Sequence, residues 1–302
     1  MNNNLYYPAF APEFHVTVVA RTDIGHVRKH NEDAYVVADL TTNRTPDRSA
    51  PKATLDVGER GVLLAVADGM GGAQSGDVAS GLVVETLRRA LDKALESGLR
   101  NAVALESAVQ SAHRVVWNTG EGAQQSGPTR MGATLTAAYI TELVAFIAEV
   151  GDSRAYLLRA GELTRLTRDQ TLVQALVDTG TLTEEQANDS TMKSVILQAM
   201  GHQPAVDVAL ARLELRDRDC LVLCSDGLTG VVTDEELRVA ILGSRQLEIA
   251  ADALVAKALE RGGPDNVTVI LAGIGGELPL SSRDEKLEET FAVIKEFDPG
   301  RS

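Results

Sequence analysis

Short runs rich in Val, Ile and Leu recur along the chain and limit its fold more than any other feature. Their continuous or alternating apolar residues are typical of β-strands. In chain order the runs are HVTVVA, DAYVVADL, GVLLAVA, ATLTAAYI, LVAFIAEV, VDVALARL, CLVLCS and NVTVILAG. Within TAAYITELVAFIAEVGDSRAYLL, only TE and GDS separate successive runs. Such short connections favour antiparallel meanders over repeated strand-helix-strand units.

Helical periodicity marks three segments, in which apolar residues lie three and four positions apart. The segments are residues 77–99, 102–118 and 246–261. Each predicted helix is long enough to cover one face of a sheet. Because strands fill the interior of the sequence and helices form two blocks, we predict an α+β fold with helices outside the sheets. A chain of 302 residues with 44% hydrophobic content can bury a large core, and we expect one domain.

Two segments look peripheral to this pattern. Residues 41–60 are polar and contain two prolines, which predicts a loop. From residue 276 the β pattern is lost, and Leu287, Phe291 and Ile294 fall at helical spacing. We therefore predict a short amphipathic helix in the tail that docks on the domain, with partner binding as the alternative.

The charge of the chain bears on its partners and location. Its 29 basic and 43 acidic residues give a net charge of −14, which repels nucleic acid and anionic lipid, so neither partner is expected. No run reaches the length of a membrane span, and the start MNNNLYYPAF lacks the order of a secretory signal. We expect a cytoplasmic monomer. Cys220 and Cys224 lie in an apolar run and are expected to be small buried hydrophobes.

Acidic residues recur where predicted strands begin or end, next to glycine or another turn residue. They are Glu32, Asp33, Asp68, Asp152, Asp226 and Asp265. A single aspartate in such a position is usually a turn residue or a helix cap. If the strand ends meet, however, several carboxylates share a small volume, and two unit charges 4 Å apart repel by about 4 kcal/mol at an effective dielectric of 20. Such a cluster requires cations.

The ligand type indicates which cations. Oxygen donors without a neighbouring set of His or Cys favour Mg²⁺ or Mn²⁺ over zinc or copper, and the nearby His26 and His30 are better explained as solvated loop residues. Two hard ions would acidify a shared water and stabilise charge on a phosphoryl group. The glycines Gly69, Gly71 and Gly72 allow the backbone to approach an ion and offer a carbonyl ligand. The alternative is a flexible turn before the next helix.

Six motifs occur along the chain in a fixed order. They are RTDIGHVRKHNEDAY (21–35), VADGMGG (66–72), MGATLTAAYI (131–140), VGDSRAYLLRAGELTRLTRDQT (150–171), CSDGLTGVV (224–232) and GGPDNVTVILA (262–272). Together they resemble the metal-dependent type 2C (PPM) protein serine/threonine phosphatases, particularly the bacterial branch. The resemblance implies a four-layer αββα sandwich, with two central antiparallel sheets flanked by helices. It places the catalytic domain in residues 1–275 and leaves 276–302 as a tail.

The resemblance also implies a centre of two Mn²⁺ or Mg²⁺ ions at one edge of the sheets. Carried over residue by residue, Asp68 would bridge the two ions. Asp226 and Asp265 would complete the first site, and the carbonyl of Gly69 would serve the second.

Other residues of the motifs have implied roles around this centre. Glu32 and Asp33 would hold waters of the second site, directly or through hydrogen bonds. Asp152 matches the position of a third, weaker metal site, which could share Asp226. Arg28, four residues before Glu32, matches the phosphate-binding arginine, and its guanidinium fork suits two phosphate oxygens.

The chain departs from the family pattern at two positions. Met70 replaces a histidine that some eukaryotic members use as a general acid, so protonation of the leaving group would fall to a metal-bound water. Gly230 replaces an acidic residue of some members, which leaves the third site with fewer ligands. Residues 169–200 match the bacterial flap, a variable element that we expect to tune substrate choice.

The implied activity is hydrolysis of phosphoserine and phosphothreonine on proteins by a metal-bridging hydroxide. Neither cysteine is followed by Arg at the spacing of a cysteine-dependent phosphatase, which is consistent with direct attack. The expected partners are phosphorylated proteins, namely a Ser/Thr kinase and its substrates, and the expected role is reversal of kinase signalling. One alternative is a catalytically silent pseudophosphatase that acts as a protein-binding regulatory module. Another is a phosphatase of small phosphate esters.

Overall fold

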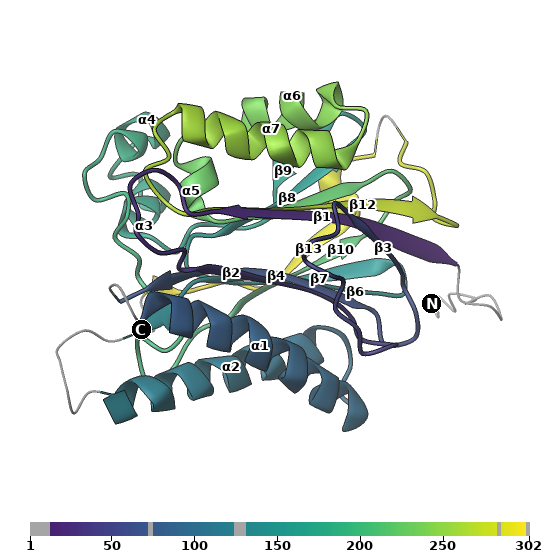
Figure 1. The fold of residues 1–302 in the computed structure, drawn as a ribbon, viewed down its shortest axis with the longest axis horizontal. Helices are drawn as coiled ribbons and strands as arrows, with labels where there is room; N and C mark the ends of the chain where they lie inside the picture. The colour runs from purple at the N-terminus through teal and green to yellow at the C-terminus, as the bar shows by residue number, and fades with distance from the viewer. Residues whose placement is uncertain (1–12, 72–74, 124–130, 283–284, 300–302) are drawn as a thin grey trace.

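Two antiparallel β-sheets pack face to face at the centre of the computed structural model, which describes residues 13–71, 75–123, 131–282 and 285–299 (Figure 1). The six-stranded sheet contains, in spatial order, β3 (Ala53–Asp56), β1 (Phe14–Asp23), β12 (Val267–Gly276), β11 (Cys220–Cys224), β8 (Arg154–Arg159) and β9 (Glu162–Arg165). The seven-stranded sheet contains β13 (Phe291–Lys295), β10 (Ala209–Glu214), β7 (Val144–Val150), β6 (Leu135–Thr141), β4 (Val62–Met70) and β2 (Asp33–Asp39), with β5 (Gly132–Ala133) paired to β4.

Helices cover the outer face of each sheet and complete four layers, as predicted (Figure 1). The outer face of the seven-stranded sheet is covered by α1 (Gly76–Glu96) and α2 (Asn101–Ala123). The six-stranded sheet carries α5 (Asp226–Thr229), α6 (Asp234–Gly243) and α7 (Leu247–Glu260). Two short helices, α3 (Leu172–Asp178) and α4 (Glu184–Asn188), lie in the segment that resembles the flap. Among the described residues, no helix has the length and apolar character needed to cross a membrane.

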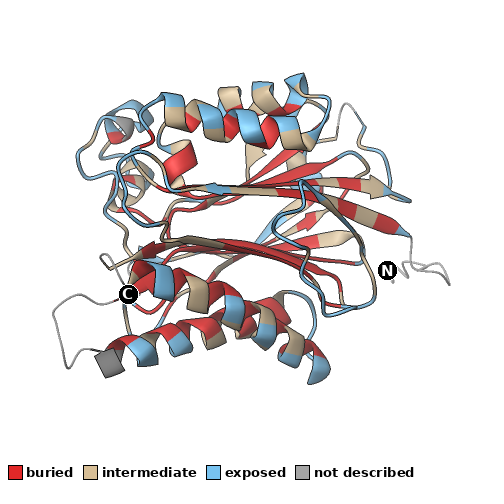
Figure 2. Cartoon of the chain, in the orientation of Figure 1, coloured by how far each residue is buried: buried red, intermediate tan, exposed pale blue. Residues whose placement is uncertain are grey.

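Strand β4 has an almost entirely apolar sequence because both of its faces are buried. Successive side chains point to opposite faces of a strand. Leu63 and Ala65 therefore pack toward the helices, whereas Val62, Leu64 and Val66 pack between the sheets. All five are fully buried, and Figure 2 shows the same burial along the central strands. Because β4 is covered on both faces, it has no polar alternation.

Two peripheral predictions were wrong. The segment 41–60 contains strand β3, which pairs with β1 through four residue pairs. The segment predicted as an amphipathic helix forms a 3₁₀ turn, η2 (Leu287–Glu289), followed by strand β13 on the edge of the seven-stranded sheet. Of the apolar side chains of β13, Phe291 packs partly against the core between the sheets, whereas Val293 and Ile294 are exposed, so the helical spacing of Phe291 and Ile294 does not mark one buried face. The seven-stranded sheet therefore continues beyond residue 275.

Helix α6 and the two cysteines lie on the side of the six-stranded sheet that α6 and α7 cover. Helix α6 was not predicted, although Thr233 and Glu236 form a capping box at its start. Cys220 and Cys224 are free and buried on β11, which confirms their expected role as small hydrophobes.

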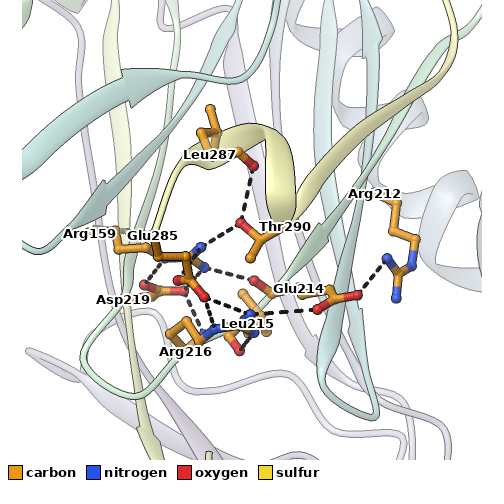
Figure 3. A network of polar contacts seen from close by, with 9 residues as sticks. All are labelled: Arg159, Arg212, Glu214, Leu215, Arg216, Asp219, Glu285, Leu287 and Thr290. Atoms are coloured by element: carbon orange, nitrogen blue, oxygen red, sulfur yellow. Dashed lines mark hydrogen bonds and ion pairs between the residues drawn. The ribbon is translucent and has the colours of Figure 1, made fainter. Parts of the chain in front are cut away.

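A buried network, which we call the tail latch, holds the segment before β13. It comprises Arg159, Arg216, Asp219, Glu285 and Thr290 (Figure 3). Arg159 forms two hydrogen bonds to the Asp219 carboxylate, at 2.8 and 2.6 Å, and a third to Thr290 at 2.7 Å. Arg216 pairs with Glu285 at 2.9 Å. In this network, every carboxylate faces an arginine.

Candidate metal centre

The acidic residues singled out from the sequence lie at one edge of the two sheets. Asp33 and Asp68 are directly opposite each other in the pairing of β2 with β4. Asp226 follows β11 as the first residue of α5, and Asp265 lies two residues before β12. Asp152 lies in the turn between β7 and β8. In antiparallel sheets the end of one strand and the start of the next share an edge, so residues distant in sequence meet there.

A cleft of about 600 Å³ opens at this edge. Its lining includes Arg28, Glu32, Asp68, Gly69, Asp226 and Asp265. Ser194, Ile196 and Gln198, from the segment that resembles the flap, also line it. The structure therefore brings six of the eight proposed site residues to one cleft, whereas Asp33 and Asp152 lie behind it as buried or largely buried groups.

The carboxyl groups of Asp68 and Asp226 lie close enough for each to shift the pKa of the other. Burial raises the pKa of Asp68 well above its ordinary value, and the charges of Asp33, Asp226 and Asp152 raise it further. Burial also raises the pKa of Asp226, but its interaction with Asp68 opposes this rise. Two buried carboxyl groups this close together form a position that a cation is suited to take.

Asp33 and Asp226 each have one buried carboxylate oxygen without a hydrogen-bond partner. The other oxygen of Asp33 accepts a hydrogen bond from Ser225 at 2.7 Å. Burial raises the pKa of Asp33 to about 7, and the nearby charges of Asp226 and Asp265 add to the rise. Unpartnered buried oxygens are costly, and a bound cation would satisfy them.

Asp265 is engaged with other groups rather than with its acidic neighbours. Its Oδ2 accepts from the guanidinium of Arg28 at 2.6 Å, and its Oδ1 accepts from the backbone N–H of Asn266 at 2.8 Å. This hydrogen bond to Asp265 raises the pKa of Arg28 above its ordinary value. In the part of the chain that the structure describes, no three His, Cys, Asp or Glu side chains already form a metal-binding set. Asp265 is thus held by Arg28 and Asn266, and its charge still raises the pKa of Asp33 and of Asp226.

Gly69 is required by close packing of the backbone. A Cβ atom at this position would lie 2.1 Å from the carbonyl oxygen of Gly76 and 2.7 Å from that of Glu32. The N–H of Gly69 donates to the same Glu32 carbonyl at 3.1 Å. The carboxyl group of Glu32 packs against Gly76 at the start of α1, where the helix dipole favours a negative charge. Gly72, the third glycine of the motif, lies outside the described residues.

Asp152 is buried behind the cleft. Burial raises the pKa of Asp152 well above its ordinary value, and the charge of Asp226 raises it further. The preceding Gly151 has φ of 104°, and a Cβ there would lie 2.9 Å from the Cβ of Thr134, so glycine fits this turn best.

Sequence reasoning missed three polar residues that hold the acidic ones in place. Ser225 bonds to Asp33, and the hydroxyl of Thr134 accepts from the N–H of Asp68 at 2.9 Å. The amide of Asn266 accepts from Glu32 N–H at 2.7 Å and donates to two carbonyls of the loop 24–30. Ser225 precedes Asp226 and Asn266 follows Asp265 within their motifs, which was the available signal, whereas Thr134 lies in the motif MGATLTAAYI without an acidic neighbour.

Two histidines also reach the cleft. His30, interpreted from the sequence as a solvated loop residue, is exposed but contributes to the lining, as does His202. Met70 lies in the same lining and has no acidic proton to donate. The described lining thus combines carboxylates with cationic and neutral polar groups.

Comparison with known proteins agrees with this combination of a layered fold and an acidic sheet edge. The family model described as protein phosphatase 2C matches residues 47–261. The chain belongs to the protein phosphatase 2C family.

Two relatives illustrate the range of this similarity. The serine/threonine protein phosphatase PstP of Mycobacterium tuberculosis is 38% identical over 256 residues, which is 84% of this chain and 44% of that protein. This chain thus spans less than half the length of that relative. The serine/threonine phosphatase stp of Listeria monocytogenes is 35% identical over 266 residues, covering 87% of this chain and 97% of that protein.

A solved structure bears on the metal. The catalytic domain of serine threonine protein phosphatase PstP in complex with two manganese ions superposes with a TM-score of 0.68 at 35% identity. The match covers 87% of this chain and 99% of that one.

Proposed function

We propose that this protein is a metal-dependent phosphatase that hydrolyses phosphoserine and phosphothreonine on proteins. The observation that carries the proposal is the meeting of Asp68 and Asp226 in one cleft, where burial and neighbouring carboxylates raise the pKa of Asp68 and Asp226 keeps an unpartnered oxygen. Relatives named as serine/threonine phosphatases, and a similar structure with two manganese ions, support it.

We assign the carboxylates to two Mn²⁺ or Mg²⁺ ions. Asp68 would bridge them, Asp226 and Asp265 would complete one site, and the carbonyl of Gly69 would serve the other. When bound, the ions lower the pKa of a shared water and neutralise charge on the phosphoryl group. An oxygen-rich ligand set suits these hard ions.

The remaining residues position these groups. Glu32 and Asp33 would orient waters of the second site, and Asp152 would contribute to a weaker third site with Asp226. Arg28 has further N–H donors besides the one bonded to Asp265, so it can release that carboxylate and hold two phosphate oxygens. Because Met70 cannot donate a proton, we assign protonation of the leaving serine or threonine to water in the cleft.

The test is hydrolysis of a phosphothreonine peptide with Mn²⁺, with Mg²⁺ and with EDTA. We expect activity only with metal, and its loss in Asp226→Ala. Asp47→Ala, which removes an exposed carboxylate from a loop away from the cleft, is the matched control and should keep full activity. Activity that survives EDTA, or that persists in Asp226→Ala, contradicts the proposal. Metal binding by calorimetry without turnover would favour the pseudophosphatase.

We further propose that residues 169–200 act as a flap and help to select the substrate of a catalytic domain that includes β13 and so extends beyond residue 275. Ser194 and Ile196 line the cleft opposite the carboxylates, which supports contact with the substrate. In cells, the expected role is to reverse the action of a Ser/Thr kinase. A comparison of rates on phosphopeptides and on small phosphate esters tests the substrate class, since faster hydrolysis of the esters contradicts it.

A further inference from the structure

A second cavity, of about 320 Å³, lies behind the segment that resembles the flap. We call it the flap-base pocket and define it by Glu149, Leu166, Arg168, Ala175, Leu197 and Val293. Its walls come from β7, the segment after β9, α3, the return of residues 169–200, and β13. Its volume is at the lower end of the range of about 300–1,000 Å³ typical of small-molecule sites.

Glu149 is the distinctive residue of this pocket. Its side chain is 4% exposed. One carboxyl oxygen accepts from the backbone N–H of Arg168 at 3.0 Å, whereas the other is buried and has no hydrogen-bond partner. Among the described residues that line the pocket, no other side chain has a buried polar atom without a partner. Such an atom is unfavourable unless a ligand supplies a donor.

The cationic side chains at the pocket are engaged elsewhere. The guanidinium of Arg168 pairs with Asp178. Lys295 pairs with Glu106 and Asp207, each at 2.9 Å. Neither cation is paired with Glu149, so the carboxyl group lacks a charged partner.

The surroundings of Glu149 also favour a cation. Burial raises the pKa of Glu149 well above its ordinary value, and among nearby charges Asp169 and Asp152 raise it while Arg165 lowers it. An isolated negative charge is therefore unfavourable here, and a bound cation would offset that cost. The apolar side chains Ile147, Leu166 and Val293 would contact the body of the ligand.

We propose that the flap-base pocket binds a small organic cation, an amidine or primary amine on an apolar body, with Glu149 as its anchor. The pocket is distinct from the metal centre, and binding there does not depend on the proposed phosphatase activity.

The pocket shares a wall with the cleft of the metal centre. Leu197 lines the pocket, while its neighbours Ile196 and Gln198 line the cleft. The side chain of Gln170 connects the two regions, because its Oε1 accepts from Gly151 N–H and from the Gln198 amide, both at 2.8 Å. A ligand in the pocket would thus lie beside Leu197, whose two chain neighbours line the cleft.

The test uses benzamidine as the cation and benzamide as its neutral isostere, with the full chain in Mg²⁺ and amide chemical shifts as the readout. We expect benzamidine to bind with about millimolar affinity, as its size allows, and to shift Glu149, Gln170 and Leu197. Benzamide should bind about tenfold more weakly, because a charge-assisted hydrogen bond is lost. Equal binding of the two compounds would overturn the proposal.

Two variants locate the site. Glu149→Gln keeps an acceptor for Arg168 N–H and should weaken benzamidine binding about tenfold. Ala175→Leu fills the pocket with Glu149 intact and should also weaken binding. The control Glu59→Gln, which changes an exposed carboxylate, should bind as the parent does. Unchanged binding in Glu149→Gln, or shifts centred on Asp68 and Asp226, would overturn the proposal.

Discussion

The two ends of the β-sandwich both gather acidic side chains, but they neutralise them differently. Strands β8 and β11 run side by side from one end to the other. In their backbone pairing, Arg154 lies opposite Cys224 near the metal centre, and Leu158 lies opposite Cys220 near the tail latch. Burial raises the pKa of Asp219 in the latch, but hydrogen bonds and charges from Arg159 and Arg216 oppose that rise.

At the metal centre, by contrast, burial and the charges of Asp33, Asp226 and Asp152 all raise the pKa of Asp68. The latch therefore stabilises the chain through its own ion pairs, whereas the proposed role of the carboxylate edge is to bind cations from solution. Substitutions of the cleft carboxylates should therefore lower activity without lowering stability, whereas substitutions in the tail latch should lower stability.

The largest expected effect is the loss of activity in Asp68→Asn. Removing the bridging carboxylate should lower kcat/KM by about 10³-fold, because metal ions contribute several kcal/mol to such reactions and each 1.4 kcal/mol is tenfold. The metal-free variant should be at least as stable as the parent, because a buried like-charge interaction is removed. Rates on a phosphothreonine peptide and urea unfolding measure the two quantities. Activity within tenfold of the parent, or a clear loss of stability, would contradict the proposed difference between the metal centre and the tail latch.

At the opposite end, Arg159→Ala should destabilise the fold by about 3–4 kcal/mol. It leaves the Asp219 carboxylate, 1% exposed, without its main partner. Arg212→Ala is the control, since Arg212 pairs with Glu214 on the surface and its loss should cost less than about 1 kcal/mol. Urea unfolding of both metal-free variants gives the difference. Similar losses in the two would mean that the latch contributes no more than a surface ion pair.

Metal binding should stabilise the parent but not Asp68→Asn. A metal at about 100 times its Kd adds roughly 2.7 kcal/mol to the free energy of unfolding. Arg159→Ala should gain the same increment, because its metal centre is intact. Thermal unfolding across a Mn²⁺ or Mg²⁺ titration checks this, and equal stabilisation of Asp68→Asn would place the metal elsewhere.

The smallest effect is a pH dependence of the metal-free protein. Because the pKa of Asp33 is raised to about 7 by burial, the folded state holds a proton that the unfolded state releases near pH 4. Stability should therefore fall as pH rises from about 4 to 7, by about 1.4 kcal/mol per unit of net shift within the coupled carboxylates. Asp33→Asn should flatten the slope, measured as the urea midpoint at each pH in EDTA. A stability that rises across this interval would contradict the assignment.

The central strands could be predicted because burial on both faces leaves a continuous apolar run, as in β4. Strand β3 could not, because it is four residues long and half exposed, so its sequence resembles a loop. Strand β13 was mistaken for a helix because pairing with β10, which no local pattern encodes, determines its conformation. The capping box at Thr233 would have revealed α6.

For the metal centre, the acidic residues and Arg28 were predictable because they recur at strand ends within motifs. The side-chain arrangement was not. Nothing in the sequence indicates that Asp265 bonds to Arg28, or that Ser225 holds Asp33. These contacts depend on the register between strands far apart in the chain.

The place of β13 at the margin of its sheet has a practical consequence. A chain shortened after Gly276 would leave β10 as the outermost strand, with backbone donors and acceptors that β13 otherwise occupies. Exposed strand margins of this kind recruit other chains. A fragment trimmed to the six family motifs would therefore be prone to self-association through β10, even with its metal ligands intact.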